Sequence, residues 1–461
     1  MSTTKTFTTM LCWLLFFSAS PLLHRGAQEK DCQIEQTPYL GWRSYKLSNG
    51  LLTLHIVPAI GGRIIQLQLG EHPYFWINKA IAGQVFSPEQ NGGPQGGWKN
   101  YGGSKVWPAP QGWQTEQQWP GPPDPVLDGG RYSGRVHTQS NRHVAVTLTS
   151  PPDKRTGLQF SRTIHVEKNS TQIQIDHTMK NIGRHRVRWA TWEVTQHDTA
   201  DPENPSEFNS NFWAYCPMNP RSLHPKGYWP MFGQVNHPSY QPHSSTGTLR
   251  IQYTHRVGKV GLDSSAGWLA TVNGRSNHCF VTTFRFQPGV PYPDNASVEF
   301  WLNGAGEFLV NGIPVGYSSD SQETPYFMES EVLSPLVELD PGEEYPYQVN
   351  WFVTRCPQPI LDVTQVGTIS RELSAITVEN EVRLEGIFGV FHSSRAEAHF
   401  RSADGKIIKI LDLGPVSPLQ VFRLSTQLSL PTETYRVSLL LVNREGQRLG
   451  VLGNTVVQLP K

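Results

Sequence analysis

Residues 187–198 carry side chains that could do acid–base chemistry. The run is rich in β-branched and aromatic residues, which is typical of a strand. If the strand persists to Asp198, then Trp189, Glu193 and His197 project to one face. A ring beside a carboxylate and an imidazole suits a sugar, because the ring packs on pyranose C–H bonds and the polar pair handles hydroxyl protons. The alternative is a structural strand in which Glu193 bonds a backbone amide.

A second group of candidates lies in residues 326–333. On a strand, Phe327, Glu329 and Glu331 share a face, and the two carboxyl groups sit about 7 Å apart. Two such acids are costly to bury unless they are hydrogen-bonded or share a proton, so their pKa values are expected to separate, as an acid and a base require. The alternatives are an exposed strand face, or an acid paired with Arg or Lys.

The loop at 98–108 combines two tryptophans, two lysines and an asparagine around a glycine pair. We interpret it as a loop that lines a ligand, with Asn100, Lys105 and Trp107 as candidate binders, or else as an aromatic cap on a sheet. Residues 124–130 offer carboxylates that a structural Ca²⁺ could use, but they lack EF-hand spacing. No metal and no other cofactor is therefore predicted.

Several function classes lack support. The chain has no phosphate-binding loop, no dinucleotide fingerprint, no zinc-protease motif and no serine-hydrolase elbow. A formal net charge of +1 with no basic block argues against a nucleic-acid partner. Cys32, Cys216, Cys279 and Cys356 lie too far apart for a zinc pattern, and form either one or two disulfides or buried thiols.

The elements that would position these groups are strands. Apolar and polar residues alternate at 52–56, 65–69, 173–176 and 298–302, and 41 Gly with 36 Pro among 461 residues favour tight turns. The fold class is therefore expected to be all-β. Two stretches are expected to be long ordered loops: 91–135, which is rich in Gly, Pro and Trp, and 199–245, which is rich in Pro.

Residues 1–27 read as a signal peptide, because Lys5 precedes a short apolar run. We expect an exported protein, periplasmic or extracellular, with no membrane span in the mature chain. A large β domain is expected over 30–356, a linker at 357–368, and a small immunoglobulin-like β-sandwich over 369–461.

The order of several short motifs resembles the galactose-mutarotase-like superfamily, the aldose-epimerase type of β-supersandwich. The segments that carry this resemblance are Pro58–Ile64, Met179–Gly183, Trp192–His197, and Met328–Glu331 with the turn Leu339–Glu343. Residues 102–111 (GGSKVWPAPQ) and 123–130 (PDPVLDGG) are similar to loops of a bacterial family of unknown function in that superfamily. The resemblance spans about residues 38–355.

The resemblance implies that Glu329 is a general base and His197 an active-site histidine, with His197 or Glu193 as the acid or orienting group. Arg63, Asn100, Lys105, Trp107 and Glu331 become candidate substrate binders. The family's Asn-His-x-Tyr-Phe signature is absent. The expected partner is a sugar or glycan, with epimerase-type chemistry on it. The alternatives are a polysaccharide lyase, in which Lys105 or Arg63 neutralises a uronate, and a non-catalytic glycan-binding protein.

Overall fold

The computed structural model describes residues 30–91, 97–310, 312–379, 381–431 and 434–458, so the expected signal peptide at 1–27 lies outside the described residues. The all-β prediction is confirmed, because strands dominate the described residues and the helical segments there are two short 3₁₀ turns, η1 (Lys79–Ile81) and η2 (Pro293–Asn295). The described part of the chain contains no helix with the length and apolarity to cross a membrane.

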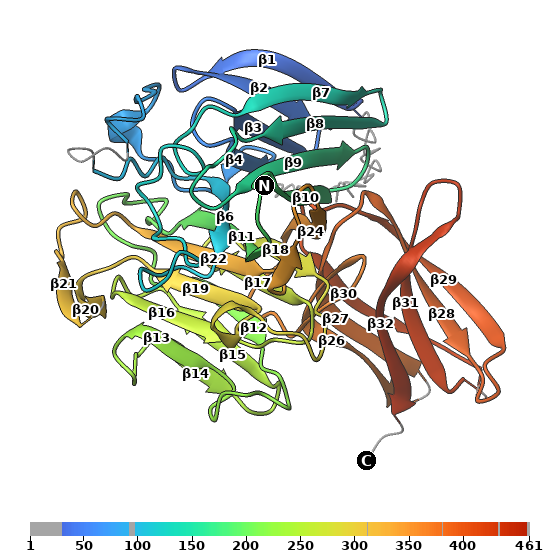
Figure 1. The fold of residues 1–461 in the computed structure, drawn as a ribbon. Coiled ribbons are helices and arrows are strands. Elements are labelled where there is room, and N and C mark those ends of the chain that lie inside the picture. The colour runs from blue at the N-terminus through green and yellow to red at the C-terminus, as the bar shows by residue number, and fades with distance from the viewer. Residues whose placement is uncertain (1–29, 92–96, 311, 380, 432–433, 459–461) are drawn as a thin grey trace, which may run out of the picture.

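Two large sheets pack face to face (Figure 1). Among the described residues the first has twelve strands: β1 (Gln33–Tyr39), β2 (Trp42–Ser48), β3 (Leu52–Val57), β4 (Arg63–Leu69), β6 (Ser104–Ala109), β11 (Val187–Asp198), β22 (Phe327–Leu333), β19 (Val298–Leu302), β16 (Gly258–Leu262) and β13 (Trp229–Gly233) in spatial order, with β23 (Val337–Leu339) on β11 and β5 (His72–Pro73) on β4.

The second sheet has ten strands within the same residues: β14 (Tyr240–His243), β15 (Thr248–Gln252), β12 (Phe212–Pro217), β17 (Trp268–Asn273), β18 (His278–Phe284), β24 (Glu344–Arg355), β10 (Ile173–Asn181), β9 (Leu158–Glu167), β8 (His143–Thr149) and β7 (Ser133–Gln139). The main core lies between the sheets and contains Ile56 and Val332 of the first with Val146 and Trp351 of the second. Each sheet therefore has an inner face toward the core and an outer face.

A third, C-terminal sheet has eight strands in the described residues: β29 (Ile407–Val416), β28 (Ser394–Arg401), β31 (Arg436–Val442), β32 (Arg448–Gln458), β26 (Gly367–Val378), β27 (Glu381–Val390) and β30 (Phe422–Leu428), with β25 (Asp362–Val363) on β26. It packs on the second sheet, where the rings of Phe352 and Phe391 stack 4.2 Å apart. Its likeness to an immunoglobulin fold stays a prediction.

The four cysteines left open by the sequence, Cys32, Cys216, Cys279 and Cys356, are buried free thiols. No disulfide is therefore found among the described cysteines.

The stretch 199–245 is not one long loop, because it contains β12, β13 and β14. The prolines in this stretch had argued against strands. They are tolerated because Pro230 and Pro242 lie on β13 and β14, which are edge strands, and because Pro217 is the last residue of β12. A separate hairpin, β20 (Gly306–Val310) and β21 (Ile313–Tyr317), sits beside β13.

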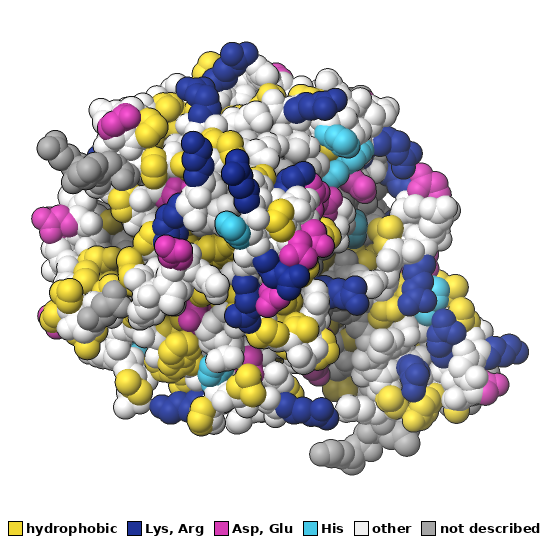
Figure 2. Space-filling model, viewed as in Figure 1, with side chains coloured by type: hydrophobic (Ala, Val, Ile, Leu, Met, Phe, Trp, Pro, Cys, Tyr) yellow, Lys and Arg dark blue, Asp and Glu magenta, His cyan; other side chains and the backbone are white. Residues whose placement is uncertain are grey.

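Charged side chains of both signs are interspersed on the face that Figure 2 shows, in keeping with the net charge of +1. Hydrophobic side chains gather where Figure 1 places the β20–β21 hairpin, whose Leu309 and Ile313 are exposed.

A glycine pair allows the loop before β6 to approach its neighbours closely. Gly102 and Gly103 both have positive φ, at +93° and +70°. A Cβ on Gly102 would lie 2.1 Å from the carbonyl oxygen of Trp76, and one on Gly103 would lie 2.5 Å from that of Ile64. Only glycine permits this approach, which brings Lys105 and Trp107 onto the outer face of the first sheet.

Candidate functional site

The outer face of β6, β11 and β22 carries a buried ion pair. Nζ of Lys105 lies 3.0 Å from Oε1 of Glu329, and the amide of Gln196 donates to the same oxygen at 2.8 Å. The Lys105 side chain is 1% exposed, whereas that of Glu329 keeps 11% of its surface. Burial lowers the pKa of Lys105, although the Glu329 carboxylate opposes that shift. Glu329 thus has the ammonium group of Lys105 fixed behind it and a small part of its side chain exposed in front.

A second charged cluster lies on the same face, farther along the sheet. Lys259 of β16 contacts Glu299 of β19 at 2.7 Å and Glu331 of β22 at 3.2 Å. Burial alone would lower the pKa of Lys259, but the two carboxylates raise it. Burial raises the pKa of Glu331 to about 8, and the nearby Glu299 adds to the shift. Trp192 closes the cluster by donating its indole N–H to Glu331 at 2.8 Å.

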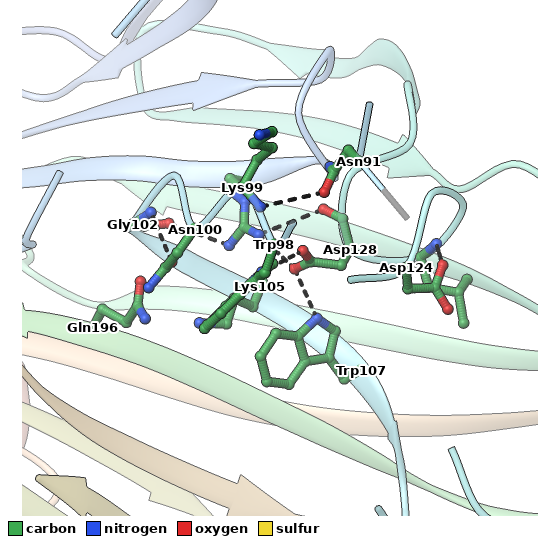
Figure 3. Close-up of polar contacts among 12 residues, drawn as sticks. Asn91, Trp98, Lys99, Asn100, Gly102, Lys105, Trp107, Asp124, Asp128 and Gln196 are labelled. Carbon is green, nitrogen blue, oxygen red and sulfur yellow. Dashed lines mark hydrogen bonds and ion pairs between the residues drawn. The ribbon is translucent and has the colours of Figure 1, made fainter. Parts of the chain in front are cut away.

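Asp128 holds the aromatic wall of the site in place (Figure 3). Its Oδ1 accepts from Arg63 at 2.5 Å and from the Trp107 indole at 3.1 Å, while Oδ2 accepts from Trp98 at 2.9 Å. Both Asp128 and Arg63 are fully buried. Nζ of Lys105 then lies 4.5 Å from the Trp107 ring centre and 5.8 Å from that of Trp98.

The carboxylates considered for Ca²⁺ are occupied by N–H donors. Asp124 accepts from the Trp119 indole and from two backbone amides, and Asp128 accepts from the groups given above. The described residues contain no group of three or more His, Cys, Asp or Glu side chains arranged to hold a metal ion.

A cavity of about 1050 Å³ opens at the ends of β11 and β22. On the outer face it is lined by Trp76, Trp98, Asn100, Tyr317 and Phe327. Asp198 also lines it, and burial raises the pKa of that carboxyl group. Glu329 follows the lining residue Phe327 by two positions on the same face of β22, so it lies just behind the lining. Burial raises the pKa of Tyr317, and the charge of Glu329 adds to that shift.

The expected meeting of Glu329 with His197 is wrong. His197 points to the inner face, where it contacts Ser330 at 2.8 Å and packs on Phe75 and Phe280. Burial lowers its pKa to about 3, so the ring is neutral at physiological pH. His197 lines the cavity from the inner face of the sheet. The backbone of the first sheet separates it from Glu329.

Glu193 also faces the core, so its predicted part in the site is wrong as well. Its carboxylate contacts His177 at 2.6 Å and Arg162 at 3.6 Å, and accepts from the Trp351 indole at 2.8 Å. The structural alternative holds here, with side-chain partners in place of a backbone amide.

Glu193→Gln is expected to lower the free energy of unfolding by about 2 kcal/mol, because the neutral amide leaves the buried Arg162 with a weaker partner. Ligand affinity should not change, because the side chain lies behind the sheet. Urea unfolding and a ligand titration measure both effects. Glu338→Gln, at an exposed pair with Arg186, is the matched control and should stay within about 0.5 kcal/mol of the parent.

The other expected binders divide into two groups. Four of them are buried in structural contacts: Arg63 and Trp107 on Asp128, Lys105 on Glu329, and Glu331 on Lys259 and Trp192. Asn100 lines the cavity instead. Sequence reasoning missed Gln196 and Asp198, which share the outer face with Trp192 and Val194. These residues alternate with Glu193 and His197, and the prediction placed the site on that opposite face of the strand. Trp98 and Asp128 belong to the predicted loop 98–108 and to the segment 124–130, but no role was predicted for either residue.

Comparison with known families gives one match. Residues 43–201 match the family model described as "Domain of unknown function (DUF4380)", which confirms the expected resemblance to a family of unknown function. No curated protein matches the chain.

Solved structures with a similar fold include galactose mutarotase-like proteins. One from Clostridium acetobutylicum has 9% identity and a TM-score of 0.43, covering 70% of this chain and 99% of its own. One from Lactobacillus casei ATCC 334 has 11% identity and a TM-score of 0.40, covering 67% and 99%. A TPR-domain containing protein from Parabacteroides distasonis ATCC 8503 has 12% identity and a TM-score of 0.46 over 73% of this chain, which spans 56% of that protein. These likenesses concern the fold alone.

Proposed function

We propose that the cavity beside Glu329 binds a sugar, and that Glu329 and Asp198 catalyse opening and closing of its ring as base and acid. The observation that carries the proposal is the position of these two carboxyl groups on one face, with Asp198 lining a cavity walled by aromatic rings and Glu329 just behind that lining. Gln196 pairs with Glu329 and Asp198 with Phe327, so the two acids are diagonal neighbours. Diagonal neighbours lie about 7–8 Å apart, with their Cβ atoms somewhat closer, so both carboxyl groups could reach the same sugar ring.

The environments of the two acids favour different protonation states. The ammonium group of Lys105 stabilises the ionised form of Glu329. Burial raises the pKa of Asp198, which favours its protonated form. Glu329 would take the proton of the anomeric hydroxyl while Asp198 gives a proton to the ring oxygen, and the bond from the anomeric carbon to that oxygen breaks. Reclosure on either face of the aldehyde returns both protons.

The aromatic wall supports a sugar as the ligand. Trp76 and Phe327 pack with their ring centres 4.8 Å apart, and Trp98 is 38% exposed. Flat apolar surfaces of this kind pack against the C–H bonds of a pyranose while the carboxylates and Asn100 receive its hydroxyl groups. The lyase alternative gains less support, because Lys105 and Arg63, its expected uronate binders, are each paired with a carboxylate.

Polarimetry tests the proposal on freshly dissolved aldoses. The protein should speed the approach to anomeric equilibrium for at least one aldose, and Glu329→Gln and Asp198→Asn should each slow it by about 100-fold or more. Both variants should still show a rise in melting temperature with that sugar, whereas Trp98→Ala should lose it. Glu338→Gln is the control for removal of a carboxylate.

Two outcomes would contradict parts of this proposal. If a sugar raises the melting temperature but its approach to anomeric equilibrium is not accelerated, the protein binds glycans without catalysis. If no sugar binds, the carbohydrate function itself fails.

A further inference from the structure

The cavity continues beyond the part that Asp198 lines and that Glu329 borders. It passes the ends of β11 and β22 and reaches the second sheet, where Thr271, Asn273 and His278 line it, and β5, where His72 does. A volume of about 1050 Å³ is at the upper end of the range for drug-sized ligands. A single sugar ring of about a dozen non-hydrogen atoms fills only part of such a space.

Two stacked imidazole rings form the wall at this far end. The rings of His72 and His278 lie 3.6 Å apart and 6° from parallel, with the edge of Tyr74 against both. Burial lowers the pKa of His72 to about 4 and that of His278 to about 3, so both rings are neutral at physiological pH. A neutral imidazole has one donor and one acceptor nitrogen, which matches the hydroxyl groups of a sugar.

The polar groups around the two rings are of a similar kind. Asn273 accepts from Asn209 at 3.0 Å through its side-chain oxygen, which holds its amide in a fixed orientation. Asp201, which also lines the cavity, is neutralised by Arg275 at 2.7 Å. The charge of Arg355 contributes to the lowered pKa of both histidines, but Arg355 is not among the residues that line the cavity. The side chains described at this end are neutral donors and acceptors with one paired acid, which fit an uncharged, hydroxyl-rich ligand.

We propose that the ligand is a neutral oligosaccharide, with its reacting end beside Glu329 and a following sugar unit against His72 and His278. This rests on the proposed function, because the end beside Glu329 is the sugar site argued there. It extends that function from a single sugar to a chain of at least two units. His72 and His278 are binding residues in it and take no part in the proton transfers.

Calorimetric titration with sugars of increasing length tests this. The probes are glucose, galactose, mannose, xylose and N-acetylglucosamine, each beside its β-1,4-linked and α-1,4-linked dimer and trimer where these exist. We expect at least one series to bind about 10-fold more tightly as a dimer or trimer than as the monomer. His278→Ala should remove that gain without changing affinity for the monomer, whereas Trp98→Ala should weaken binding of both.

Further variants keep the result interpretable. His72→Gln and His278→Gln preserve polarity and should lose part of the gain, so the test stands if His278→Ala does not fold. His399→Ala, a half-buried histidine on the C-terminal sheet, should change no affinity.

The failures of the two proposals are distinguishable. If monomers bind and Glu329→Gln removes catalysis, but no series gains affinity with length, the oligosaccharide proposal is overturned and the sugar site stands. A gain that survives both His278→Ala and His72→Gln overturns it as well. If no sugar of any length binds, both proposals are wrong.

Discussion

Lys259→Met is expected to lower the free energy of unfolding by about 3–5 kcal/mol, because it removes the ammonium group between two buried carboxyl groups. Nζ of Lys259 lies 2.7 Å from Glu299 and 3.2 Å from Glu331, and both glutamate side chains are 1% exposed. Water cannot replace the lost charge there. Methionine keeps the length and apolar stem of the side chain, so the loss of stability measures the effect of removing the charge. Urea unfolding followed by circular dichroism measures it.

The loss should grow as the pH rises from about 5 to 8. Burial already holds the pKa of Glu331 at about 8, above its ordinary value of 4.5. A carboxyl group with a raised folded-state pKa binds more protons when folded, so its stability is lost as the pH rises through that pKa. Lys259 opposes that shift, so without it the pKa of Glu331 rises further and more stability is lost as the pH rises. An equal loss at pH 5 and pH 8 would contradict this explanation.

Two comparisons distinguish the effect of removing the charge of Lys259 from an effect of disturbed packing. Lys46→Met removes the cation of an exposed pair with Glu35 and should cost at most about 1 kcal/mol. The triple variant Lys259→Met, Glu299→Gln, Glu331→Gln should recover much of the loss, since neutral amides in place of the whole cluster leave no unpaired charge. A triple variant no more stable than Lys259→Met would point to packing instead.

Asp128→Ala is expected to cost about 3–5 kcal/mol and to loosen the aromatic wall of the site. The change leaves the fully buried Arg63 without its carboxylate and frees the indole N–H groups of Trp98 and Trp107. Ligand affinity should fall along with stability, because Trp98 is the exposed ring that borders the cavity. Urea unfolding gives the first effect, and tryptophan fluorescence with a sugar titration gives the second.

Double variants test whether Arg63 accounts for the loss in stability. Arg63→Met combined with Asp128→Ala should cost clearly less than the sum of the two single changes, because the pair is then removed as a unit. Asp340→Ala removes the acid of an exposed pair with Arg186 and is the control. It should change stability by at most about 1 kcal/mol and should not change ligand affinity. Additive losses from Arg63 and Asp128 would show that they act independently.

Much of the fold could be predicted because a strand repeats every two residues. Alternation identified the strands at 52–56, 173–176 and 298–302, and placed Glu329 and Glu331 on one face of β22. Alternation fails where both faces of a strand are buried. Residues 189–197 of β11 are buried throughout, so nothing in their pattern says which face meets the core, and His197 was assigned to the wrong one.

Strand order brings together residues that are distant in the sequence. Lys259 reaches Glu331 because β16, β19 and β22 are neighbours, and Lys105 reaches Glu329 because β6 and β22 flank β11. Pairing between strands so far apart depends on how the whole sheet packs, and no local spacing records it.

The amino-acid sequence alone determined that this chain folds as strands, and that two glutamates near residue 330 share a face. Only the tertiary structure decided that Glu329 is partnered by Lys105 and Gln196, and that Asp198 shares its face of the sheet while His197 lies on the opposite face. The physical reason is that alternation is a local property of the backbone. The side of a sheet that becomes core depends on what the second sheet covers.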